Sequence, residues 1–270
     1  MPFEFLKNND PDQDETRVDS TPVLSKILGA YPLSIYLILI NVIIFFMMLI
    51  LDSYENAWKF GSMNYVLIGE KQEFYRFFTA LFLHGHEIHI ILNMFSLFMV
   101  GPFIEHVFGR VNFFVLYMVT GIMGCVASFY INAPDIASHE RGVPEAVGAS
   151  GAIFGIVGGF TIFLIINKTR LVDKIRLRLL KNIALVLVLN LGFGFFSGLP
   201  IDNAGHIGGL LAGALLGLFI RPEIFGYQKM RLMKPLGWIF FLLLLISFIW
   251  STWRYISVYS DIPGWGAIFS

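Results

Sequence analysis

The sequence predicts an all-α polytopic membrane protein, from its composition, its scarcity of charge and its long apolar stretches. Hydrophobic residues make up 56% of the 270 residues, charged residues only 14%, and the mean hydropathy is +0.71. Soluble domains carry about 25% charged residues, so too few polar side chains remain here to cover a water-facing surface. Helices suit the long apolar stretches because they pair their own backbone groups where lipid offers no partner.

Seven uncharged stretches have the length of a membrane-spanning helix. Each holds 17 to 25 residues, against the roughly 20 that a helix needs to cross the hydrocarbon core. Residues 77–86 are also uncharged but are too few to span, so we interpret them as part of an interfacial or membrane-embedded loop. The predicted spans are 27–51, 88–104, 111–134, 146–167, 182–201, 203–220 and 235–253.

The spans divide the chain into three expected parts. Residues 1–26 are polar and mostly acidic, unlike a signal or transit peptide, and we expect a cytoplasmic tail. Residues 27–220 hold six spans and should form one six-helix core. Residues 221–270 hold a basic loop and a seventh, C-terminal span.

Lysine and arginine predict the orientation. With seven alternating spans, fourteen of the 19 basic residues fall on one side and five on the other. Because the basic side faces the cytoplasm, the N-terminus is expected inside and the C-terminus outside. We expect the location to be a bacterial plasma membrane.

Several classes of function are excluded or disfavoured. The net charge of zero excludes a nucleic-acid binder that depends on bulk positive charge. The residues His86-Glu87-Ile88-His89 lack the spacing of the zinc motif H-E-x-x-H, so we expect no metal and no other cofactor. A transporter or channel would call for intramembrane carboxylates or a repeated helical pattern, and the sequence has neither.

Three polar groups interrupt the apolar spans, and all lie toward the outer face in the predicted orientation. They are His84 with His89 and Asn93 at the start of span two, residues 148–151 at the start of span four, and residues 203–206 at the start of span six. Polar groups at membrane depth are costly, so their gathering at one level marks a candidate functional site.

Ser150 and His206 are suited to nucleophilic catalysis. A serine hydroxyl becomes a nucleophile when a base takes its proton, and histidine does so near neutral pH. Small residues let helices approach closely in lipid, which predicts that spans four and six meet. The small residues form two stripes at four-residue spacing, Gly151, Gly155 and Gly159 on span four and Gly209, Gly213 and Gly217 on span six.

Donors for a developing oxyanion are also available. His89 and Asn93 are four residues apart and share a helix face. The Ser150 N–H lies at a helix start, where unpaired donors favour negative charge. Asp202 precedes His206 by four residues but is not assigned the role of orienting it. A Ser–His dyad is therefore predicted rather than a triad.

Each of these residues has a simpler explanation when taken alone. Ser150 could cap a helix, the glycine stripes could serve packing only, and a histidine near an interface is often just hydrogen-bonded. Only their conjunction favours catalysis.

The motifs together resemble the rhomboid family of intramembrane serine proteases, over about residues 34–220. The motifs are specific when they occur together. The seventh span resembles the added C-terminal helix that some members of the family carry. The matching segments, in order, are Tyr75-Arg76 to His84, His89 to Asn93, Gly101 with Glu105 and Gly109, Gly148-Ala149-Ser150-Gly151, and Ala204 to Gly209.

The resemblance implies roles for the site residues. Ser150 would be the nucleophile and His206 its base, with His89, Asn93 and the Ser150 N–H as the oxyanion hole. Phe154 would pack against the histidine, and His84 would be structural or would organise water. Gly148 and Gly151 flank the serine in the family motif.

The resemblance also implies partners. Transmembrane segments of other membrane proteins would be the substrates, cut within the lipid bilayer near the outer face, with span five as the side of entry. Tyr75-Arg76 would hold the first loop. The alternative is a non-proteolytic rhomboid-like protein that binds transmembrane segments in membrane-protein quality control.

Overall fold

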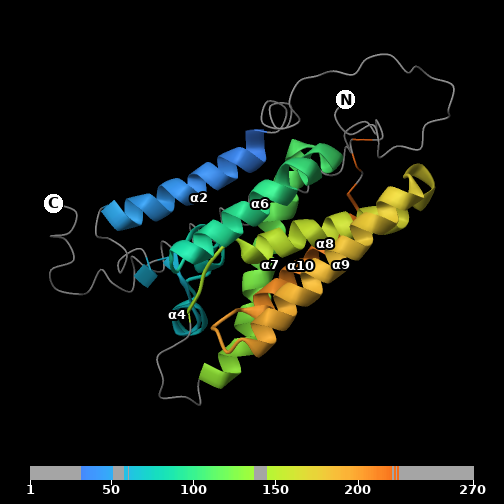
Figure 1. Cartoon of the computed structure of the whole chain (residues 1–270). Coiled ribbons are helices and arrows are strands. Elements are labelled where there is room, and N and C mark those ends of the chain that lie inside the picture. Colours follow the sequence, from blue (N-terminus) through green and yellow to red (C-terminus); the bar gives the residue numbers. More distant parts are fainter. Residues whose placement is uncertain are drawn as a thin grey trace, which may run out of the picture.

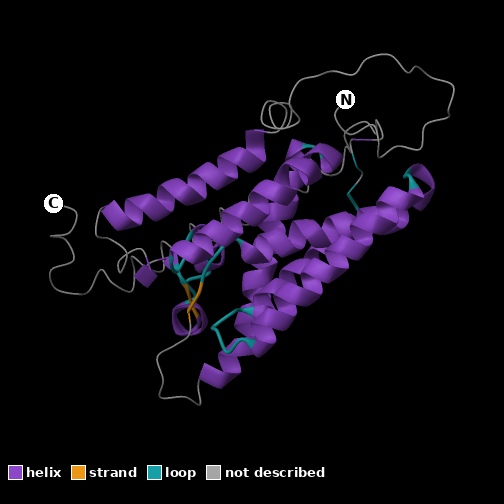
Figure 2. Ribbon diagram, viewed as in Figure 1, coloured by secondary structure: helices purple, strands orange, loops and turns teal. Residues whose placement is uncertain are grey.

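The computed structural model describes residues 32–50, 58–59, 61–136, 145–220, 222 and 224. Most of these residues are helical (Figure 2). The predicted tail, 1–26, and the seventh span, 235–253, lie outside the described residues. The elements, shown in Figure 1, are α2 (Pro32–Ile50), β1 (Met63–Asn64), α4 (Tyr65–Lys71), α5 (Arg76–Thr79), η2 (Ala80–Phe82), α6 (Glu87–Phe108), α7 (Arg110–Ile136), β2 (Glu145–Ala146), α8 (Ser150–Ile166), η3 (Lys168–Arg170), α9 (Asp173–Phe196) and α10 (Asn203–Gly217).

Six helices correspond to the first six predicted spans, which confirms the all-α polytopic fold. Helices α2, α6, α7 and α9 are long and apolar enough to cross a membrane. Helices α8 and α10 have 17 and 15 residues. α8 occupies the centre and packs mainly against α10 and α7, while α2 lies beside α6 at one side and α9 at the other (Figure 1). The two shortest of these six helices, α8 and α10, therefore form the main helix contact of the bundle.

Several predicted boundaries were wrong, and those of span five differ most. The sequence predicts span five at 182–201, but α9 begins at Asp173 and ends at Phe196. Basic side chains do not break a helix, because their charged ends reach water while their stems lie along the apolar surface. Span four was expected from residue 146, yet residues 145–146 are a strand and the helix starts only at Ser150.

A buried carboxylate joins α2 to α6. Glu105 is 1% exposed, and its Oε2 accepts hydrogen bonds from the Ser34 backbone N–H at 2.9 Å and from the Ser34 hydroxyl at 2.7 Å. The N–H groups of a first helical turn have no partner within the helix. Glu105 supplies an acceptor to the first turn of α2. Its Oε1 also lies 3.8 Å from Nε of Arg110, at the start of α7. One side chain thus ties together three helix ends.

The segment between α2 and α6 forms a folded loop that Arg76 holds from inside. Arg76 is 1% exposed and donates to Glu73 Oε2 at 2.6 Å. It also donates to the backbone carbonyls of Ser62 and Lys59, at 2.9 and 2.8 Å. The expectation that Tyr75-Arg76 holds this loop is confirmed for Arg76, which connects its two halves.

We expect Arg76→Met to destabilise the fold by about 3–5 kcal/mol, because Glu73 would become an unpaired buried carboxylate. Thermal or denaturant unfolding of the purified chain in detergent measures this. Arg178→Met, which changes an exposed arginine of α9, is the control and should differ little from the parent. An equal effect of the two substitutions would refute the role assigned to Arg76.

The same loop pairs with the segment that leads to Ser150. Strands β1 and β2 are antiparallel, with Met63 opposite Ala146 and Asn64 opposite Glu145 (Figure 2). The Glu145 carboxylate accepts from the Asn64 amide at 2.8 Å and from the Ser62 hydroxyl. The start of α8 is therefore positioned by the first loop as well as by its helix neighbours.

Candidate functional site

Ser150 lies at the first turn of the central helix. The N-cap of α8 is Ala149, which makes no side-chain capping bond, so the alternative that Ser150 is a helix cap is wrong. Gly148 has φ +116°, a backbone conformation that residues with a side chain rarely adopt. Its N–H donates to the Ala80 carbonyl at 2.8 Å. This turn presents Ser150 at the helix start with its N–H outside the helical bonding pattern.

His206 approaches Ser150 from α10. The Asp202 side chain caps this helix by accepting from the Gly205 N–H at 2.9 Å, and the His206 N–H donates to the Asp202 carbonyl at 3.1 Å. The cap places His206 in the first turn, where its Nε2 lies 2.9 Å from Ser150 Oγ. This is hydrogen-bonding distance between a candidate nucleophile and a candidate base.

Paired glycines bring the two helices to backbone contact. A Cβ at Gly213 would fall on the carbonyl oxygen of Gly155 and 2.8 Å from its Cα. Gly217 meets Gly159 in the same way, and Gly209 meets Gly151. The two stripes match in ascending order, so α8 and α10 run parallel and both begin at the site. The close packing predicted from the sequence is confirmed.

The His206 ring is held by an aromatic neighbour. Phe154, one turn after Ser150, stacks on it with 4.4 Å between ring centroids and 4° between planes. No acceptor within the described residues bonds to the buried His206 Nδ1. The Asp202 carboxylate instead caps the helix and accepts from the Asn132 amide at 3.5 Å. The structure thus shows a serine–histidine pair beside a stacked aromatic ring.

His89 and Asn93 on α6 face the turn before Ser150. A Cβ built on Gly148 would lie 2.7 Å from His89 Nε2 and 3.7 Å from Asn93 Nδ2. The Asn93 amide donates to the His89 carbonyl at 3.0 Å, one turn back along α6. Glycine at position 148 is therefore needed twice, for its positive φ and for the space that His89 occupies. The three polar groups that the sequence places at one level converge here.

His84 lies behind these residues rather than among them. It is fully buried, and its ring packs edge-on against His89 with 5.2 Å between centroids. Burial, and then the neighbouring His89, lower the pKa of His84 to about 3. A neutral, buried imidazole at this position is suited to a structural role, in which His84 packs against His89 and holds its ring.

Sequence reasoning missed a polar cluster beneath α10. The Tyr65 hydroxyl lies 2.8 Å from Ser128 Oγ, and the Asn132 amide donates to Ser128 Oγ at 3.1 Å and to Asp202. Burial raises the pKa of Tyr65 above its ordinary value. The cluster links α4 and α7 to the cap of the helix that carries His206. Serine and asparagine four apart on α7 were the available signal.

Comparison with known proteins places the chain in a family. Residues 71–223 match the family model described as Rhomboid domain. RHOMBOID-like protein 5 of Arabidopsis thaliana is 35% identical over 191 residues, covering 70% of this chain and 57% of the relative. Rhomboid protease GluP of Bacillus subtilis is 36% identical over 168 residues, covering 61% and 30%. Rhomboid protease AarA of Providencia stuartii is 30% identical over 207 residues, covering 71% and 73%.

The chain thus spans just over half the length of RHOMBOID-like protein 5 and under a third of the length of GluP. The matched region contains Arg76 and all the helices that carry site residues. An apolar multi-helix fold and this match together make it an integral, multi-pass membrane protein. The chain belongs to the rhomboid family.

Proposed function

We propose that this protein is an intramembrane serine endopeptidase that uses Ser150 and His206 as a catalytic dyad. The 2.9 Å distance between Ser150 Oγ and His206 Nε2 is the observation that carries the proposal. The names of GluP and AarA as rhomboid proteases support it. The substrates would be transmembrane segments of other membrane proteins.

In the proposed first step, Ser150 Oγ attacks the carbonyl carbon of the scissile peptide bond. His206 Nε2 takes the hydroxyl proton as the new C–O bond forms. The carbonyl oxygen becomes an oxyanion, for which the Ser150 N–H, His89 and Asn93 are the available donors. His206 then gives the proton to the leaving nitrogen, the C–N bond breaks, and an acyl-enzyme remains on Ser150.

In the proposed second step, water replaces the departed amine. His206 takes a proton from the water, whose oxygen attacks the acyl carbon. The same donors hold the second oxyanion, and the proton returns to Ser150 Oγ as the ester breaks. The Phe154 ring keeps the imidazole plane fixed through both steps, which limits the reorganisation that each proton transfer requires.

We propose that a substrate enters beside α9. None of the described side chains of α9 is buried. Its later part meets α10 through Gly194, which lies against the Asn203 side chain, and through a 3.5 Å hydrogen bond from Asn203 to the Leu191 carbonyl. So little buried surface makes α9 the helix that moves at least cost. The substrate helix must also unwind locally to expose a carbonyl to Ser150.

The orientation belongs to the same proposal. The basic segment 168–181 lies at the end of α8 opposite Ser150, so cleavage near the outer face follows if that segment is cytoplasmic. The N-terminus would then be inside and the C-terminus outside. The bacterial plasma membrane stays a prediction, because the relatives come from plants and bacteria.

Reconstitution separates the protease from the binding protein. We expect the purified chain in liposomes to cut at least one of several single-span test substrates into two fragments, detected by mass spectrometry. Test substrates with glycine or proline in the span should be cut best, because they unwind most easily. Binding of several such substrates without any cleavage would favour the non-proteolytic alternative.

A further inference from the structure

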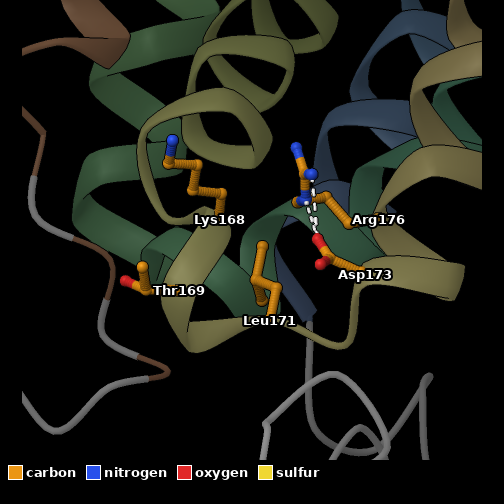
Figure 3. A pocket seen from close by; sticks show the side chains of 5 residues that line it. All are labelled: Lys168, Thr169, Leu171, Asp173 and Arg176. Atoms are coloured by element: carbon orange, nitrogen blue, oxygen red, sulfur yellow. Dashed lines mark hydrogen bonds and ion pairs between the residues drawn. The ribbon is translucent and has the colours of Figure 1, made fainter.

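A pocket lies at the end of α8 opposite Ser150, where the chain turns into α9. Its volume is about 540 Å³, within the range of about 300–1,000 Å³ that small-ligand sites occupy. Ser150 starts α8, and Lys168 comes just after its end, so the catalytic residues take no part in the pocket. Figure 3 shows the residues that line it, Lys168, Thr169, Leu171, Asp173 and Arg176.

The pocket is positively charged. Arg176 donates from Nε and Nη2 to one oxygen of Asp173, at 3.0 and 2.9 Å, so the one lining carboxylate is already balanced. The Lys168 side-chain amine makes no hydrogen bond or ion pair to any residue that the structure describes. This amine and the Arg176 guanidinium point to the same side in Figure 3, and the Asp173 carboxylate lies below the guanidinium to which it is bonded. The pocket thus carries two cationic side chains, Lys168 and Arg176, and one carboxylate, Asp173, so a net positive charge remains for an anionic ligand.

The surroundings combine positive charge with an apolar surface. Segment 168–181 carries six basic residues and a single acid, Asp173. Close by, Ile165, Ile166 and Leu177 are each 48–49% exposed. Lysine and arginine together bind phosphate oxygens through charge-assisted hydrogen bonds. Basic pockets between membrane helices hold anionic headgroups in this way, with acyl chains along the neighbouring apolar side chains.

We propose that the pocket of Lys168 and Arg176 binds a phosphate group, carried by an anionic phospholipid or present as a free ion. The bound group would bridge the end of α8 and the start of α9. Because α9 has no buried side chain among the described residues, such a bridge would hold its first turns against the bundle. The proposal does not depend on the protease activity.

Ligand-dependent unfolding tests it, since a ligand that binds only the folded chain raises the melting temperature. The purified chain is melted in detergent with added phosphatidylglycerol, phosphatidylcholine or inorganic phosphate. The pocket variant is Lys168→Gln with Arg176→Gln. The matched control is Arg178→Gln with Lys181→Gln, which removes the same charge from exposed positions of α9.

We expect phosphatidylglycerol, but not phosphatidylcholine, to raise the melting temperature of the parent and of the control. The pocket variant should lose this rise in melting temperature, because its affinity for the lipid should fall by about tenfold or more. A shift with inorganic phosphate as well identifies the free ion as a ligand, and a shift with the lipid alone identifies the headgroup. Equal loss in both double variants, or no shift with either phosphate source, overturns the proposal. Should the pocket variant not fold, Lys168→Gln alone replaces it and should also lose the shift, because that side chain is exposed and its loss leaves the fold intact.

Discussion

Replacing Ser150 by alanine is expected to lower the rate of substrate cleavage by about a thousandfold or more, to below detection. The substitution removes the atom that would attack the carbonyl, and His206 has no other described hydroxyl at hydrogen-bonding distance. His206→Ala should have an effect of similar size, because residues that act as one unit give losses that do not add. Liposome assays of the parent, the two single variants and the double variant measure this.

Two controls separate lost chemistry from lost folding. Ser96→Ala changes a half-buried serine of α6 to which no role in the proposed reaction is assigned, and it should leave the rate unchanged. Ser150→Ala loses its hydrogen bond to His206, so its free energy of unfolding should fall by only about 0.5–1.5 kcal/mol and the variant should stay folded. Cleavage that survives Ser150→Ala or His206→Ala would show that the dyad assignment is wrong.

Gly213→Ala is expected to lower both stability and activity, although it adds only one methyl group. That methyl would overlap the carbonyl oxygen of Gly155, and neither backbone can rotate away. Overpacking of this kind costs about 1–3 kcal/mol. The helices must separate, which moves His206 from Ser150, and a misplacement of about 1 Å can lower a rate about a hundredfold. Melting and cleavage assays of the same preparation measure both effects.

The chain offers a graded control series for this substitution. At Gly217 the nearest atom to a new Cβ would be the Gly159 oxygen at 2.8 Å, and at Gly192 nothing lies within 4 Å. Gly213→Ala should therefore lose more stability than Gly217→Ala. Gly192→Ala should lose none and should gain about 0.5–1 kcal/mol, because alanine favours a helix interior. Equal effects at positions 213 and 192 would refute backbone contact between α8 and α10.

The helices of the fold could be predicted because lipid makes charge placement informative. Six of the predicted spans appear as helices, and the matched glycine stripes correctly indicated that α8 contacts α10. Boundaries were predicted less well. A charged residue marks where an apolar stretch ends, but it does not mark where a helix ends. The helix α9 includes the basic residues that precede its apolar stretch.

The parts of the site that could not be predicted depend on contacts between distant loops. Nothing local indicates that Glu145 would pair with Ser62 and Asn64, because these residues are far apart in sequence and hydrogen-bond through side chains. Asp202 was visible as a carboxylate near His206, but only the structure distinguishes a helix cap from a partner of the imidazole. Three-dimensional placement decides between the two, and spacing does not.

The most direct test of the Ser150–His206 dyad is covalent labelling of the purified chain with a fluorophosphonate, followed by mapping of the modified peptide. The probe reacts with a serine only when its hydroxyl is activated by a base. We predict a single modification, on Ser150, that disappears in His206→Ala and persists in Ser96→Ala. Labelling of another serine, or of Ser150 to the same extent without His206, would contradict the dyad.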